Sequence, residues 1–206
     1  MEGLDRIETS RRPGTEQFLD GRNPVGFDVL SFWQWAYSDL VSNATRGVVA
    51  EYLVARALGA ANGVREEWAA YDVLDPRGIT VQVKSAAYVQ SWRQDRLSSI
   101  IFGCGKTQAW DAATNELGID RRRHAHVYVF ALLAEKDQSK LNPLDVAQWQ
   151  FYVVPTAVLD ARRRSQHSIT LPSLRELHAG PVTYWELGAA VGAAMEHHLS
   201  VVGHQE

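Results

Sequence analysis

The pattern of apolar and polar positions predicts alternating helices and strands along this chain. Helical spacing of apolar residues predicts helices over 32–41 and 45–58, the second ending at Gly59. Residues 126–133, HVYVFALL, are apolar on both faces, which is typical of a buried central strand. The same patterns predict a strand over 149–154, a helix from Pro155 to about Arg164 and a last helix from Thr183 to about His198. Together these elements predict an α/β fold in which helices flank a central mixed sheet.

Residues 71–85, YDVLDPRGITVQVKS, predict a tight hairpin between strands over 66–73 and 79–85. The segment DPRG has turn chemistry, because its proline presets φ and its glycine tolerates a positive φ. A three-residue loop would make Asp75 and Ile79 the closing pair. A two-residue loop would shift the pairing by one residue and turn each side chain to the other face. The turn type therefore decides which side chains share a face.

The three-residue loop places Asp72 opposite Gln82, with Lys84 on the same face. Asp75, an odd number of residues from Asp72, projects to the opposite face. A carboxylate, an amide oxygen and a lysine gathered in this way can hold a divalent metal and stabilise charge on a phosphate. A solvated polar strand face would show the same alternation, so that interpretation stays open.

The predicted helix over 45–58 carries a carboxylate, Glu51, on the face that we expect to contact the sheet, among Val48, Tyr52, Ala55 and Leu58. None of its neighbours three or four residues away can pair with it. A carboxylate on an apolar face needs a distant partner or a metal. Three alternatives stay open: Glu51 pairs with a distant arginine or lysine, lies at an exposed edge of the helix, or is a further metal ligand.

Composition places the chain among ordinary globular proteins. It has 206 residues, 46% hydrophobic and 22% charged, and these values predict one domain over 26–200 between a flexible arm (1–25) and a tail (201–206). The single cysteine, Cys104, and the absence of a long apolar run favour a cytoplasmic protein without a membrane segment. The net charge of −3 means that any DNA-binding surface must be local.

Glu51 on a helix, then Asp72, then a strand with x-Val-Lys resemble the PD-(D/E)XK nuclease superfamily, which has the restriction-endonuclease-like fold, over roughly residues 45–92. The resemblance implies hydrolysis of DNA that depends on Mg²⁺, or on Mn²⁺, in restriction, defence or repair. It makes Asp72 the central metal-bridging acid, Lys84 the catalytic lysine and Glu51 the helix-borne acid. Gln82 departs from the family pattern, since an aspartate or glutamate is usual there.

The amide at Gln82 keeps a second interpretation open, in which the chain is a non-catalytic DNA-binding or interaction module on the same fold. Alternatively, Glu66 or Glu67 supplies the missing acid. The oligomeric state stays open, with a homodimer as one option. Side chains that follow the lysine strand are the expected DNA contacts: Gln90, Arg93, Arg96 and Lys106.

Overall fold

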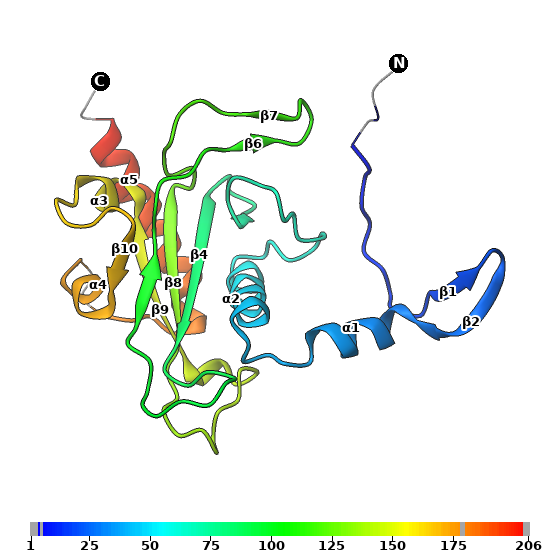
Figure 1. The fold of residues 1–206 in the computed structure, drawn as a ribbon. Coiled ribbons are helices and arrows are strands. Elements are labelled where there is room, and N and C mark those ends of the chain that lie inside the picture. The colour runs from blue at the N-terminus through cyan, green and yellow to red at the C-terminus, as the bar shows by residue number, and fades with distance from the viewer. Residues whose placement is uncertain (1–3, 5, 178–179, 204–206) are drawn as a thin grey trace.

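The computed structural model describes residue 4 and residues 6–177 and 180–203. Its centre is a mixed sheet with helices on both sides (Figure 1), which confirms the predicted α/β class with flanking helices. None of the described helices combines the length and the apolar character needed to cross a membrane.

The central sheet has four strands in the order β3-β4-β8-β9. Strand β3 (Val73–Leu74) is antiparallel to β4 (Thr80–Ala87), β4 is parallel to β8 (Val127–Leu133), and β8 is antiparallel to β9 (Trp149–Pro155). Every residue of β8 is buried, as its continuous apolar run predicts. The hairpin therefore joins the sheet at its edge, with β4 anchored to the most buried strand.

The two longest helices cover one face of this sheet. Helix α2 (Asn43–Ala57) and helix α5 (Leu187–Val202) contribute apolar side chains to the same core cluster as alternate residues of β4, β8 and β9. Buried members of this cluster are Ala50, Val54, Val81, Val83, Val129, Phe151 and Val191. Because strand side chains alternate, Gln82 and Lys84 point away from this cluster.

The opposite face is covered by shorter elements, of which the sequence patterns predicted only the helix that begins after Pro155. Strand β5 (Ile101–Gly103) pairs with β10 (Ser168–Thr170), and α4 (Leu171–Leu177) follows directly. Together with α3 (Thr156–Ala161), they pack on Tyr128, Phe130 and Tyr152 of the sheet in a second core cluster. A smaller hairpin, β6 (Trp110–Asp111) with β7 (Glu116–Leu117), and a 3₁₀ turn over Val146–Gln148 complete this part of the chain.

The helix ends largely follow the capping signals. Ser42 caps α2 through a hydrogen bond from the Thr45 amide, and Gly59 follows the helix at φ 71°. Thr183 and Glu186 form the predicted capping box, although a 3₁₀ turn (Tyr184–Glu186) precedes α5.

The N-terminal segment is more regular than predicted. It holds a β-hairpin, β1 (Gln17–Asp20) with β2 (Asn23–Asp28), where we expected an arm without regular structure. A cross-strand ring contact between Phe18 and Phe27, with centroids 5.0 Å apart, joins the two strands. Helix α1 (Val29–Tyr37) follows, capped by Asp28, and Figure 1 shows the hairpin and α1 extending away from the sheet.

Candidate active site

The turn between β3 and β4 has the predicted three-residue loop. The Asp75 amide donates to the Ile79 carbonyl at 3.0 Å, and the Gly78 amide donates to the Asp75 carbonyl at 3.0 Å. Gly78 has φ 83°, the left-handed conformation that favours glycine. Val73 pairs with Val81, and the Asp72 amide donates to the Val81 carbonyl at 3.1 Å. Asp72 therefore lies at the end of the paired register, with its side chain beside that of Gln82.

Asp72 occupies the open end of this hairpin, next to the edge of β4. Its Oδ2 accepts a hydrogen bond from the Val83 amide at 2.6 Å. Burial raises the pKa of Asp72 above its ordinary value of 3.8, against the opposing effect of the Val83 amide. Repulsion from Glu51 raises this pKa further, whereas Lys84 and Arg65 lower it. The structure therefore brings a second carboxylate and two cations within electrostatic range of Asp72.

Gln82 contacts Asp72 directly, as the register requires. Its side-chain amide nitrogen donates to Oδ2 of Asp72. In this orientation Gln82 supplies the carboxylate with a donor, and its own oxygen points away from that contact. Rotation of the amide by 180° about its terminal bond would exchange the two atoms and present the oxygen instead.

Glu51 has a distant partner, which was one of the alternatives. The guanidinium of Arg65 donates to both carboxylate oxygens of Glu51, from Nε to Oε2 and from Nη2 to Oε1, the latter at 3.2 Å. The predicted helix face was wrong in part: Ala55 and Leu58 pack in the core, but Val48 and Tyr52 are exposed, and α2 is most deeply buried at Ala50 and Val54. Glu51 therefore lies beside the buried stripe of α2 rather than at its centre.

Arg65 is the site residue that sequence reasoning missed. It lies in an irregular segment 14 residues after Glu51, where neither helical nor strand spacing indicates a contact. The hydrogen bond to Glu51 also raises the pKa of Arg65. The only signal in the sequence was that Glu51 has no partner on its own helix. This signal predicts a cation near Glu51 but does not identify the residue that carries it.

Comparison with known families places this geometry in context. Residues 29–171 match the profile of the bacteriophage T4 endonuclease IV family. The chain belongs to the bacteriophage T4 endonuclease IV family. No curated protein matches the chain. The segment matched to the endonuclease IV family contains Glu51, Arg65, Asp72, Gln82 and Lys84, but neither strand of the N-terminal hairpin.

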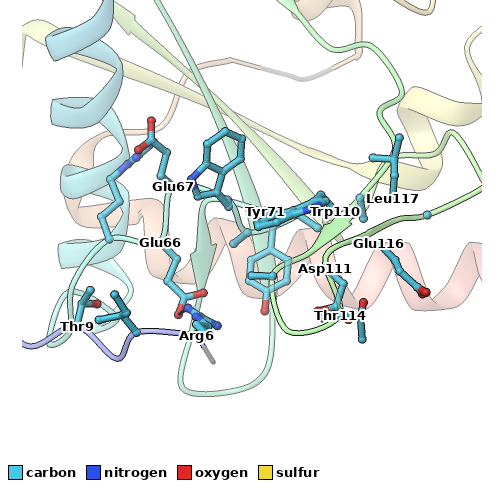
Figure 2. A pocket seen from close by; sticks show the side chains of 18 of the residues that line it. Arg6, Thr9, Glu66, Glu67, Tyr71, Trp110, Asp111, Thr114, Glu116 and Leu117 are labelled. Atoms are coloured by element: carbon cyan, nitrogen blue, oxygen red, sulfur yellow. Dashed lines mark hydrogen bonds and ion pairs between the residues drawn. The ribbon is translucent and has the colours of Figure 1, made fainter. Parts of the chain in front are cut away.

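Two adjoining clefts are lined by three of these residues, Glu51, Arg65 and Asp72. The smaller, about 570 Å³, is lined by Glu51, Arg65, Tyr71 and Asp72. The larger, about 1140 Å³, extends to the β6–β7 hairpin, as the side chains around Trp110 in Figure 2 show. Both clefts are lined by Arg65, Glu66, Ala69 and Tyr71. Arg65 and Tyr71 thus stand where one cleft passes into the other.

The substitute acids considered from the sequence, Glu66 and Glu67, line the larger cleft. Glu66 is paired with Arg6 at 2.9 Å, and Figure 2 shows these two side chains facing each other. Glu67 is exposed. In the described part of the chain no three His, Cys, Asp or Glu side chains are grouped closely enough to hold a metal ion.

The four side chains expected to contact DNA lie in different parts of the structure. Gln90 is buried and accepts a hydrogen bond from Arg46 at 3.1 Å, so its side chain is used inside the protein. Arg93 and Arg96 are exposed in the loop after β4. Lys106 is half-exposed and lies 3.7 Å from Asp160, on the β5 side of the sheet. The structure therefore does not gather these four residues into one surface.

Proposed function

We propose that this chain is a Mg²⁺-dependent deoxyribonuclease that hydrolyses phosphodiester bonds at the open end of the β3–β4 hairpin, with a role in restriction, defence or repair. The observation that carries the proposal is the β3–β4 hairpin, in which Asp72 lines a cleft, contacts Gln82 and lies within electrostatic range of Lys84. Membership of a family named for an endonuclease supports a DNA nuclease in general. These are also the residues that resemble the PD-(D/E)XK pattern.

The donor set suits a weakly held metal ion. Among the described residues, both hydrogen bonds to Asp72 go to Oδ2, which leaves Oδ1 available to a cation. Gln82 would add a neutral oxygen after rotation of its amide, and Glu51 would join only when Arg65 releases one of its oxygens. Mg²⁺ commonly binds through one or two carboxylates and keeps several waters, so these residues fit it. When bound, the ion would polarise the phosphate and activate a water.

Lys84 supplies the positive charge of this site. It lies on the Asp72 face of β4 and lowers the pKa of Asp72 by charge attraction. An ammonium at this position stabilises the negative charge that develops on the phosphate oxygens during attack. The partial burial of Asp72 strengthens these interactions, because the local dielectric is lower than that of water.

Incubation of the purified protein with plasmid and linear DNA tests this proposal. We expect cleavage in Mg²⁺ or Mn²⁺, none in EDTA, and none with Lys84→Ala. Lys140→Ala is the matched control, because Lys140 is exposed and pairs only with Asp137 among the described residues. Cleavage that persists in EDTA or with Lys84→Ala would contradict the proposal.

A non-catalytic DNA-binding module is the second candidate function. It is favoured by the neutral Gln82 and by the pairing of Glu51 with Arg65, which together leave Asp72 as the one carboxylate of the site with an oxygen that no described residue binds. DNA that is retarded on a native gel but stays intact in both metals would support this second function and contradict the first.

A further inference from the structure

We propose that Arg65 binds a DNA phosphate next to the scissile bond, and that Glu51 positions the Arg65 guanidinium for this contact. The inference rests on the proposed function, because it assigns the substrate backbone to the border of the same site. In this inference Glu51 holds the Arg65 guanidinium in place, a role that needs no metal ion.

The position of Arg65 is the first support. Arg65 lines both clefts, together with Tyr71, the residue next to Asp72. Its side chain is 39% exposed, whereas that of Glu51 is 16% exposed. A nucleic acid strand that runs from the larger cleft to Asp72 must therefore pass the Arg65 side chain.

The hydrogen bonds of Arg65 leave one part of its guanidinium available. Nε and Nη2 donate to the two oxygens of Glu51. Nη1 donates to no described residue, and it carries two N–H groups of the planar fork. Arginine binds phosphate through such N–H groups at fixed angles, so a guanidinium held on one side can bind a phosphate oxygen on the other.

The charges around the site create a need for this cation. Carboxylates line both clefts and would repel an incoming polyanion. They are Glu51 and Asp72 in the smaller cleft, Glu67, Asp111, Glu116 and Asp120 in the larger one, and Glu66 in both. Lys84 and Arg65 are the two cations that act on Asp72. Lys84 is fixed to β4 beside Asp72, whereas Arg65 is the cation shared by both clefts. Arg65 therefore offsets the charge of Glu51 at the place where the two clefts meet.

Glu51 determines where the guanidinium lies. Arg65 belongs to a segment without helix or strand structure, so no backbone ladder orients its side chain. Glu51 is on the third turn of α2, a helix packed on the sheet, and its two contacts to Arg65 hold the planar group in one orientation. A lysine in place of Arg65 would keep the charge and lose this two-point contact.

DNA binding in EDTA tests the inference without any metal. The probe is a fluorescein-labelled oligonucleotide, single-stranded or duplex, followed by fluorescence anisotropy at several salt concentrations. We expect Arg65→Ala to bind about tenfold more weakly and to lower the salt slope of log K by about 1. Arg65→Lys should fall between Arg65→Ala and the wild type. Arg22→Ala, in the exposed β1–β2 turn, is the matched control and should stay within about twofold of the wild type.

The role of Glu51 is tested by a double-mutant cycle. In the Arg65→Ala background, Glu51→Ala should tighten DNA binding, because it removes a negative charge. With Arg65 present, the same change should give no such gain, because the guanidinium loses its orientation. An equal gain in both backgrounds would contradict the positioning role.

Other outcomes overturn the phosphate contact. The first is that the wild type does not bind DNA at low salt. The second is that the wild type and Arg65→Ala have the same DNA affinity and the same salt slope of log K. The third is that Arg22→Ala loses as much affinity as Arg65→Ala. If Arg65→Ala does not fold, Arg65→Gln retains a donor for Glu51 and replaces it in every comparison. If DNA binds through Arg65 but stays intact in Mg²⁺, the result contradicts the proposed hydrolysis and leaves the role of Arg65 standing. If DNA is cleaved but Arg65→Ala binds it as well as the wild type does, the result contradicts the role of Arg65 and leaves the proposed hydrolysis standing.

Discussion

The β3–β4 hairpin holds an aspartate at each end, and the two are hydrogen-bonded in different ways. At the turn, the buried Asp75 carboxylate accepts from the amides of Arg77 and Ile79 at 2.8 and 2.9 Å and from the Arg77 side chain at 2.7 Å. At the open end, beside a cleft, Asp72 accepts hydrogen bonds from described residues only at Oδ2, and burial raises its pKa.

This difference separates a structural carboxylate from one available to chemistry. The Asp75 carboxylate has donors at both oxygens, so its charge is stabilised by the turn that it closes. Asp72 carries a charge that its surroundings stabilise poorly and that an added cation would stabilise better. Two residues of the same type, three positions apart, therefore make opposite predictions for stability and activity.

The largest expected effect is that of Asp72→Asn on cleavage. Loss of the carboxylate should lower the rate at least about 10²–10³-fold, the range observed when one group that stabilises a transition state is removed. Asparagine keeps an oxygen for the Val83 amide, so the fold should persist. Rates of plasmid cleavage, with circular dichroism as the control for folding, measure the effect. A variant that cleaves at the wild-type rate would remove Asp72 from the site.

The pH dependence of stability gives Asp72 a second test. Its folded pKa lies above the ordinary 3.8, so its contribution to stability is complete below that value and is lost as the pH rises through the raised folded pKa. Relative to wild type, Asp72→Asn should therefore gain stability as the pH rises through this window. Urea unfolding at a series of pH values measures the difference, and a gain that shrinks with rising pH would contradict the sign.

Asp75→Asn should show the reverse pattern. It removes a charged acceptor from a buried site with three hydrogen bonds, so the free energy of unfolding should fall by about 2 kcal/mol. Cleavage per folded molecule should stay close to that of the wild type, since Asp75 projects away from Lys84. Urea unfolding at neutral pH measures the loss. A stable but inactive variant would show that the two ends of the hairpin are not separate in function.

Gln82→Glu sharpens the comparison at the open end. A carboxylate at this position should raise Mg²⁺ or Mn²⁺ affinity about tenfold, equivalent to about 1.4 kcal/mol. Without metal, the variant should lose about 1 kcal/mol of stability, because it replaces a donor to Asp72 by a like charge. Metal titration by calorimetry and unfolding in EDTA measure both effects. Unchanged metal affinity would mean that the amide is not what weakens the site.

The smallest effect is expected from Gly78→Ala at the turn. A Cβ added to Gly78 would meet no atom within 4 Å, so the cost is confined to the positive φ of 83°. Stability should fall by about 1 kcal/mol, with cleavage unchanged. Thermal unfolding and plasmid cleavage measure the two quantities. A loss of cleavage larger than the loss of folded protein would mean that the turn influences the site directly.

The parts of the fold that follow from local rules were predictable from the sequence. The hairpin register depends on four consecutive turn residues and a period of two, and the buried strand β8 depends on one apolar run. The capping box at Thr183 likewise needs only residues three positions apart. These local signals were sufficient to bring Asp72, Gln82 and Lys84 to one place.

Contacts between distant segments were not predictable in the same way. Arg65 is joined to Glu51 across an irregular loop, Gln90 is drawn inward by Arg46 of α2, and β5 pairs with β10, more than 60 residues later. Each contact depends on which segments the folded sheet brings together. Residue spacing can show that Glu51 needs a partner. The path of the irregular segment after α2 determines that this partner is Arg65.

The contact between Asp72 and the Val83 amide also affects whether the edge of the sheet can pair with strands of other molecules. Strand β3 pairs with β4 over only two residues, and an unpaired strand edge can recruit strands from other molecules. The Asp72 carboxylate occupies the Val83 N–H that a foreign strand would need, and its negative charge is placed at that same edge. We therefore expect the residue proposed for chemistry also to hinder edge-to-edge aggregation of the sheet.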